Sequence, residues 1–206
     1  HVKNFLIQLK LIMETIQYKI NNLFKDFSFI NEKLLIFKGI LPNSILSEIT
    51  LFVEESRKYK DHNLGFLKHM TNAGNNEFRC FIPSSLVNSS LFYSYLYYLG
   101  NEYISKFKNS SQEVKLVKKY YHSYDNYDLW VNFSQKDNNN PTHTHSGIIS
   151  GVIYVSNPEN IPTIFNNNFY YKGKPGEILL FPSNLKHSVP KQLTNDERIT
   201  LSFNLE

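Results

Sequence analysis

The spacing of apolar residues changes near residue 114, and this change constrains the fold more than any other feature of the chain. In the first half, apolar residues recur at intervals of three and four, which is typical of one buried face of a helix. This pattern predicts helices from Phe5 to Phe24, from Asn43 or Ser44 onward, and from Leu86 to Phe107. The run from Lys33 to Lys38 predicts a short strand, and residues 60–83 predict loops with at most short strands.

From residue 114 onward apolar and polar residues alternate, as they do along strands that bury one face. The segments that predict strands are Leu129–Phe133, Ile148–Val155, Glu177–Phe181 and Arg198–Asn204. Helices followed by a run of short strands indicate an α+β fold. We expect the strands to close as a double-stranded β-helix, a jelly-roll or cupin-like barrel, with supporting N-terminal helices outside it. The 206 residues then make a single domain, in which 1–110 are mainly helical support and 111–206 form the jelly-roll core.

Composition and charge narrow the choice of partner and compartment. The net charge of +4 is spread along the chain, so no basic stripe indicates a nucleic-acid partner. No uninterrupted apolar run approaches the ~20 residues that span a bilayer, and we expect no membrane partner. The single cysteine, Cys80, rules out an internal disulfide and fits a reducing compartment, which predicts a cytoplasmic protein, in the host cytoplasm if the source is viral.

Three histidines of the strand-rich half give the clearest indication of chemistry. His143 and His145 are one residue apart, so in an extended strand both imidazoles project from one face, and His187 follows on a later strand. Neutral imidazole is the commonest transition-metal ligand. A third ligand from a distant strand would complete a facial set that leaves positions open on Fe(II). The fourth histidine of this half, His122, lies among tyrosines and is interpreted as structural.

His143 and His145 alone are equally well explained as solvated polar residues, and His187 alone is better explained as an ordinary, partly buried histidine. Their order His-x-His…His is what favours a metal site. A second assignment uses only one of His143 and His145, with water in the remaining position.

Arg198 opens the strand that follows the His187 strand, and Thr200 shares its face. A single arginine at a strand start is usually solvated. A guanidinium beside a hydroxyl, however, is well suited to binding a carboxylate. The pair therefore fits the far end of a dicarboxylate whose other end chelates the metal.

The second half resembles the 2-oxoglutarate/Fe(II)-dependent oxygenase superfamily, in particular a prolyl-hydroxylase-like branch found in marine bacteria and phages. The order and spacing of several short motifs carry the resemblance, and none of them is specific alone. The motifs are Trp130-Val131-Asn132, His143-Thr144-His145, Ser150 to Val155, Gly176 before Leu180 to Ser183, His187 to Pro190, and Arg198 to Asn204. Residues 1–110 carry no such motif.

The resemblance implies an oxidoreductase, a dioxygenase that binds Fe(II), consumes 2-oxoglutarate and O2, and hydroxylates a C–H bond of its substrate. It implies that the iron is held by His143, His145 and His187. The chain departs from the superfamily at His145, because that position usually carries Asp or Glu. An imidazole there changes the charge of the site.

The resemblance also implies a binding site for 2-oxoglutarate. Its far carboxylate is bound by Arg198 with Thr200, Tyr154 contacts the same carboxylate, and Asn132 points toward the co-substrate. A core aromatic residue explains Tyr154 equally well, and a surface amide explains Asn132 nearly as well. Trp130 is interpreted as a core residue.

Two other functions fit the same residues. One is a three-histidine, cupin-like dioxygenase that does not use 2-oxoglutarate, and the other is a non-catalytic jelly-roll module for binding or structure, in which the histidines are incidental.

The substrate is a small molecule or a peptide, and the resemblance suggests a prolyl or other peptide side chain. Its contacts would come from the loops at 60–75, 135–142 and 157–172, which one sequence does not decode. Helices outside such a barrel can pair, so the oligomeric state stays open.

Overall fold

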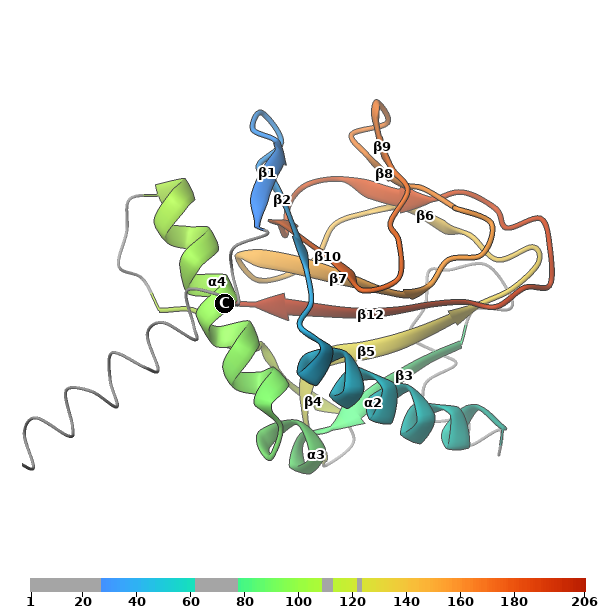
Figure 1. The fold of residues 1–206 in the computed structure, drawn as a ribbon, viewed down its shortest axis with the longest axis horizontal. Helices are drawn as coiled ribbons and strands as arrows, with labels where there is room; N and C mark the ends of the chain where they lie inside the picture. Colours follow the sequence, from blue (N-terminus) through green and yellow to red (C-terminus); the bar gives the residue numbers. More distant parts are fainter. Residues whose placement is uncertain (1–26, 62–77, 109–112, 122–123) are drawn as a thin grey trace, which may run out of the picture.

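The computed structural model describes residues 27–61, 78–108, 113–121 and 124–206, and Figure 1 shows their fold. The helix predicted from Phe5 to Phe24 lies outside these residues. The short strand predicted from Lys33 to Lys38 is observed as β2 (Ile36–Ile40), which pairs with β1 (Ser28–Asn31). Within the described part of the chain, the helices are too short or too polar to cross a membrane.

The helices fall largely where the apolar spacing predicts them. α2 (Asn43–Asp61) begins directly after Pro42. The single helix expected from Leu86 to Phe107 is instead two, α3 (Ser84–Asn88) and α4 (Leu91–Lys108).

Hydrogen bonds to the first N–H groups of α4 explain why a new helix begins there. The Ser90 hydroxyl accepts the N–H of Tyr93 at 3.2 Å. The Glu48 carboxylate, from α2, accepts the N–H groups of Leu91 and Phe92 at 3.0 and 2.7 Å. The first turn of a helix has no internal partner for these donors, so acceptors at this point favour a helix start.

The larger sheet has the strand order β1-β2-β10-β7-β12-β5-β3, with β4 paired to β5, and its pairings are antiparallel. The bounds of its other strands are β3 Phe78–Pro83, β4 Lys118–Tyr121, β5 Tyr124–Ser134, β7 Ile149–Ser156, β10 Glu177–Pro182 and β12 Arg198–Leu205. The four strands predicted in the second half appear as β10, β7, β12 and β5. They are neighbours in this order at the centre of the sheet. Strands from the first half join them on both sides, so strands are not confined to the second half.

The smaller sheet has the order β6-β11-β8-β9 and is also antiparallel. Its strands are β6 (Asn140–His143), β8 (Thr163–Phe165), β9 (Phe169–Tyr171) and β11 (His187–Val189). The strands β8 and β9 lie within residues 157–172, for which the sequence predicts a loop. The described residues are thus mostly antiparallel sheet with few helices.

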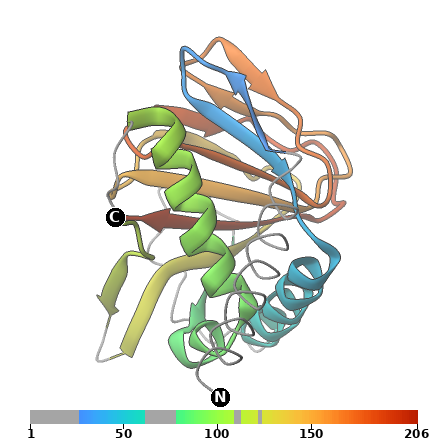
Figure 2. The same cartoon turned by 60° about the vertical axis from the view of Figure 1, so that its left-hand side comes forward.

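The sheets and helices form layers. Figures 1 and 2 show the smaller sheet over one face of the larger sheet, while α2 and α4 lie against the other face. Two separate apolar cores match these layers. The helix-side core includes Ile49 and Leu96 from the helices, and Leu201 from β12. The core between the sheets includes Phe165 from β8 and Leu179 from β10.

Alternation along β12 assigns its two faces to these two layers. Leu201 and its neighbours at odd positions join the helix-side core, so residues at even positions face the smaller sheet. These even positions are polar: they are Arg198, Thr200, Ser202 and Asn204. Three of the four are buried and Ser202 is partly buried. The face of β12 that borders the space between the sheets is therefore polar and largely shielded from solvent.

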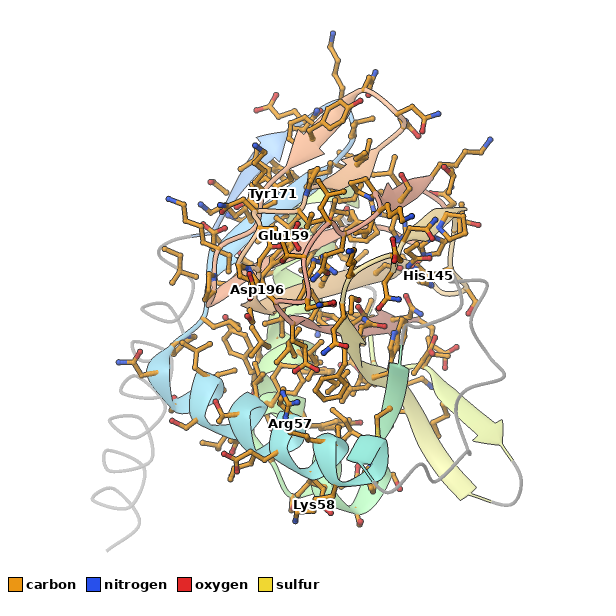
Figure 3. The ribbon with its side chains drawn as sticks, turned by 90° about the vertical axis from the view of Figure 1, so that its right-hand side faces the viewer. Arg57, Lys58, His145, Glu159, Tyr171 and Asp196 are labelled. Atoms are coloured by element: carbon orange, nitrogen blue, oxygen red, sulfur yellow. The ribbon has the colours of Figure 1, made fainter. Side chains whose placement is uncertain are left out.

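A salt bridge connects α2 to the residue just before β12. The Arg57 guanidinium forms a salt bridge of 2.6 Å with Glu197, the residue before Arg198, and lies with its Cζ atom 5.0 Å from the centroid of the Phe133 ring. Figure 3 shows Arg57 on α2, pointing toward the sheet. This contact fixes the point at which Arg198 enters the space between the sheets.

Candidate functional site

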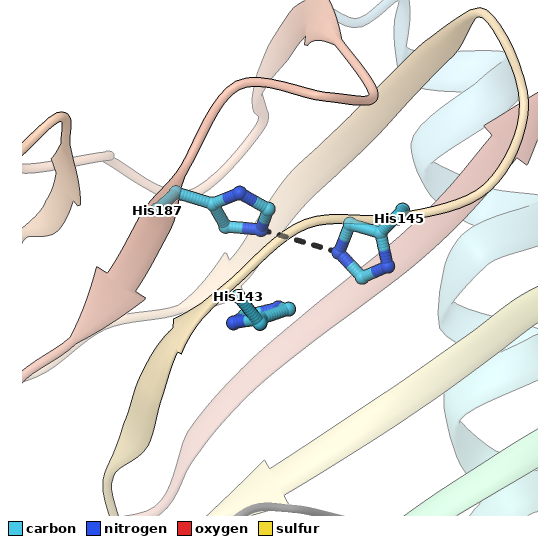
Figure 4. A group of neighbouring side chains, drawn as sticks. All are labelled: His143, His145 and His187. Atoms are coloured by element: carbon cyan, nitrogen blue, oxygen red, sulfur yellow. Dashed lines mark hydrogen bonds between the residues drawn. The ribbon is translucent and has the colours of Figure 1, made fainter.

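Strand pairing in the smaller sheet brings two of the three histidines together, and a loop supplies the third. His143 ends β6 and His187 begins β11, and the two residues lie directly opposite each other in the antiparallel register. His145 follows β6 in a loop. Ring nitrogens of the three imidazoles lie within 4.8 Å of one another (Figure 4). The cluster expected from the spacing His-x-His…His therefore forms between the two sheets.

Backbone carbonyls fix the orientation of two of these rings. Nδ1 of His143 lies 2.7 Å from the carbonyl oxygen of Pro141, and Nδ1 of His187 lies 2.9 Å from that of Leu185. A carbonyl oxygen can only accept, so each Nδ1 carries the hydrogen and each Nε2 keeps its lone pair. Metal-binding histidines are commonly oriented by this kind of contact.

The third ring completes an arrangement that fits a metal ion. Nε2 of His145 lies 3.2 Å from Nε2 of His187. Two nitrogens bound to one ion at right angles, with bonds of about 2.1 Å, are separated by about 3 Å. The backbone N–H of His145 donates to the carbonyl oxygen of Ser183 at 2.8 Å, which ties its loop to the end of β10. The residues present fit one transition-metal ion held by three imidazoles.

Aromatic rings surround the cluster. The ring of His187 lies 4.9 Å from that of Phe181 and 6.0 Å from that of Phe165, measured between centroids. The indole ring of Trp130 lies 5.7 Å from the imidazole of His145. Trp130 is buried, as expected of a core residue, but its contact with a candidate ligand was not expected from the sequence. These rings exclude water from one side of the cluster.

The histidines open on a pocket between the sheets. Its described lining includes Arg198, Thr200 and Ser202 from β12, with Asn132 from β5 and Thr163 from β8. Among the described lining residues none is acidic, and the charged side chain is the buried guanidinium of Arg198. A pocket with a cation and hydroxyl groups, and with no carboxylate, is suited to an anion.

Tyr154 lies behind this pocket rather than in its described lining. Its ring is fully buried, and its centroid lies 5.9 Å from Cζ of Arg198. The hydroxyl is 2.7 Å from Oγ1 of Thr163, which does line the pocket. Burial raises the pKa of Tyr154 to about 12, so the phenol stays protonated. The predicted contact between Tyr154 and a co-substrate stays a prediction.

Asn132 lies on the inner face of β5, opposite Thr200 of β12. Its side-chain amide contacts Trp130, Thr200 and Ser202. Ser202 was not among the predicted site residues, although the alternation that places Thr200 beside Arg198 puts Ser202 on the same face.

A family model decides which proteins this site resembles. Residues 162–204 match the family described as "Putative 2OG-Fe(II) oxygenase", and the matched segment contains His187, Arg198 and Thr200. This segment is therefore similar to the 2-oxoglutarate/Fe(II)-dependent oxygenases, over 43 of the 206 residues. His143 and His145 lie before the matched residues.

Solved structures share the fold of this chain. The non-heme alpha ketoglutarate dependent epimerase SnoN from nogalamycin biosynthesis is similar with a TM-score of 0.54 and 12% identity, over 85% of this chain and 81% of that chain. A prolyl-4-hydroxylase of Pseudomonas putida is similar with a TM-score of 0.50 and 11% identity, over 90% of this chain and 96% of that chain. At these identities the similarity establishes a common fold and nothing further. A comparison with curated proteins gives no match.

The family consists of enzymes that use Fe(II) and 2-oxoglutarate, and the cluster of three histidines fits iron. The predicted superfamily, enzyme class and cofactors are therefore confirmed. The substrate, the source and the roles of individual residues stay predictions.

Proposed function

We propose that the protein is a dioxygenase that uses Fe(II), O2 and 2-oxoglutarate to hydroxylate a C–H bond of its substrate, with His143, His145 and His187 as the iron ligands. One observation carries this proposal. The three imidazole nitrogens converge within 4.8 Å at a pocket whose wall also carries the buried Arg198 beside Thr200. A metal site and a carboxylate site in one pocket suit a co-substrate that chelates with one end and carries a carboxylate at the other.

The finer description of the fold belongs to the same proposal. Two antiparallel sheets face each other across the site, and helices cover the outer face of the larger one. This arrangement supports a double-stranded β-helix, in which the smaller sheet supplies His143 and His187, the loop after β6 supplies His145, and the larger sheet supplies the carboxylate site.

The residues of the chain have distinct tasks in this reaction. His143 and His187 keep their hydrogens on Nδ1 through the carbonyl contacts, and so present Nε2 to the metal. Arg198 and Thr200 bind the far carboxylate and hold the co-substrate in one orientation. Phe165 and Phe181 cover His187 and keep water from that side of the site.

The bound iron supplies the oxidation, in which 2-oxoglutarate is decarboxylated to succinate and CO2 while one atom of O2 enters the substrate. The chain needs no proton donor or acceptor of its own for this reaction. Its contribution is ligand geometry, orientation of the co-substrate and exclusion of water.

Turnover of 2-oxoglutarate tests the proposal. Succinate formation is measured with Fe(II) and O2, alone and with proline-containing peptides, in the wild type and in His187→Ala and Arg198→Ala. We expect His187→Ala to abolish it, and Arg198→Ala to raise the KM for 2-oxoglutarate by at least about 30-fold, because a buried charge loses its partner. Lys186→Ala, an exposed neighbour of His187, is the matched control and should behave as the wild type. Succinate formation that persists unchanged in both site variants would overturn the proposal.

The ligand set itself favours one competing function. Three imidazoles without a carboxylate also suit a cupin-like dioxygenase that does not use 2-oxoglutarate. Calorimetry separates the two with N-oxalylglycine, an inert analogue of 2-oxoglutarate. Binding of the analogue to the metal-loaded wild type supports the proposal, and no binding supports the competing function.

A further inference from the structure

The amide of Asn132 has an unambiguous orientation. The indole N–H of Trp130 points at Asn132 Oδ1 over a distance of 2.9 Å. An indole nitrogen can only donate, so the atom facing it must be the amide oxygen rather than the amide nitrogen. The NH2 group of Asn132 therefore faces β12.

Both hydrogens of this NH2 group are already used. Asn132 Nδ2 donates to Oγ1 of Thr200 and to Oγ of Ser202, each at 3.1 Å. Asn132 thus has no N–H left for a ligand unless one of these two bonds breaks. Asn132 points toward the pocket, as predicted, but its amide hydrogens bind the two hydroxyl groups of β12.

The hydrogen bonds that the two hydroxyl groups accept from Asn132 determine where their own hydrogens can point. A hydroxyl has one hydrogen to donate, and neither Thr200 nor Ser202 makes another side-chain hydrogen bond within the described residues. Each hydroxyl that accepts from Asn132 therefore has its own hydrogen available. Both residues line the pocket, on the same face of β12 as Arg198.

We propose that Asn132 is a positioning residue that makes Thr200 and Ser202 hydrogen-bond donors to the bound co-substrate, and that Ser202 is a further contact for it. Together with Arg198, the two hydroxyls give β12 a row of donors, which suits a dicarboxylate. Trp130 holds the amide in place and also contacts His145, so it lies between the co-substrate site and the metal site. The assignment of the anion as 2-oxoglutarate rests on the proposed function.

The change Asn132→Asp tests the proposal with little change in shape. A carboxylate can only accept, so it keeps the Trp130 bond and forces both hydroxyls to donate to it rather than to the pocket. We expect the affinity of the Zn(II)-loaded protein for N-oxalylglycine, measured by calorimetry, to fall about 100-fold, since hydrogen bonds to a charged ligand are lost. The affinity for Zn(II) alone should change less than about threefold, which a general disturbance of the site would not allow.

Asn140→Asp is the matched control for charge. Asn140 lines the same pocket but forms no hydrogen bond with Thr200 or Ser202. The Asn140→Asp variant adds the same negative charge to the pocket, while the hydroxyl groups of Thr200 and Ser202 remain donors. Its effect on N-oxalylglycine affinity should stay below about tenfold, because a charge without direct contact is partly screened.

A double-mutant cycle provides a second and independent test. Ser202→Ala should lower the affinity for N-oxalylglycine about tenfold by itself, since one hydrogen bond to a charged group is lost. In a Thr200→Val, Ser202→Ala background, Asn132→Asp should lower the affinity for N-oxalylglycine no more than Asn140→Asp does. The two hydroxyl groups through which Asn132 acts are then absent. These variants also keep the proposal testable if Asn132→Asp does not fold.

The outcomes separate this inference from the proposed function. If the wild type binds N-oxalylglycine while Asn132→Asp or Ser202→Ala binds it equally well, the inference fails and the function stands. If the metal-loaded wild type does not bind N-oxalylglycine, both fail.

Discussion

His143 and His187 lie directly opposite each other on the antiparallel strands β6 and β11, with their ring centroids 4.3 Å apart. Their approach is set by backbone pairing, so two of the three candidate ligands depend on the register of the smaller sheet. His145 depends instead on a loop, which is held by the hydrogen bond from its N–H to Ser183 and by the ring of Trp130. We therefore expect His145 to be the ligand that tolerates replacement best.

Replacing His145 by aspartate tests its role as a ligand. Asp and His both bind transition metals, so His145→Asp should keep one equivalent of bound Co(II). His145→Ala should lower Co(II) affinity by at least about tenfold, since one of three ligands is lost. Calorimetry measures both, with Thr144→Ala, an exposed residue of the same loop, as the control. Wild-type affinity in His145→Ala would instead support the assignment in which water takes that position.

Removing the Glu48 carboxylate tests how α4 begins. In Glu48→Ala the N–H groups of Leu91 and Phe92 lose their acceptor, which should cost about 1 kcal/mol of the free energy of unfolding. A loss of this size corresponds to about 2–4 °C in Tm for a chain of this length. Thermal unfolding measures it. Glu55→Ala, which removes only the exposed salt bridge with Lys58, should change Tm by less than about 1 °C, and equal Tm values for both variants would show that Glu48 does not cap α4.

The thiol of Cys80 should be unreactive in the folded protein. Burial raises its pKa to about 11, outweighing a hydrogen bond from Ser56 that lowers it. The thiolate is the reactive form, and two pKa units reduce its population about 100-fold at pH 8. We expect the native protein to react with an aromatic disulfide reagent at least about 100-fold more slowly than the protein unfolded in guanidinium. Similar rates in both states would contradict the buried position.

The raised pKa of Cys80 also has a consequence for stability. Because the folded state holds the proton more tightly, this group stabilises the fold fully at pH values below the unfolded pKa. Its contribution should be lost as pH rises from about 9 toward 11. Urea unfolding at several pH values, with Cys80→Ala for comparison, measures this contribution.

The long elements were predictable from the sequence because their periodicity extends over enough residues. α2 and β12 repeat their apolar spacing several times, whereas β7 and β10 are nearly continuous buried runs, which also predict strands. β8, β9 and β11 have three residues each, and β6 has four. Strands of three or four residues are too short to show an alternating pattern, so the smaller sheet was not predicted.

The grouping of the site residues was predictable, but their surroundings were not. Spacing alone placed His143 with His145, and Arg198 with Thr200, on common faces. Alternation does not tell whether a polar face meets solvent or a second sheet, so it gave no sign that Asn132 would be enclosed. The contact of Trp130 with His145 likewise depends on how the two sheets face each other.

A crystal structure of the protein grown without oxygen, with Fe(II) and 2-oxoglutarate, tests the central claim most directly. The account predicts one iron within about 2.1 Å of a nitrogen from each of His143, His145 and His187, with the far carboxylate of 2-oxoglutarate at Arg198. Iron bound elsewhere, or 2-oxoglutarate with neither end at these residues, would contradict it.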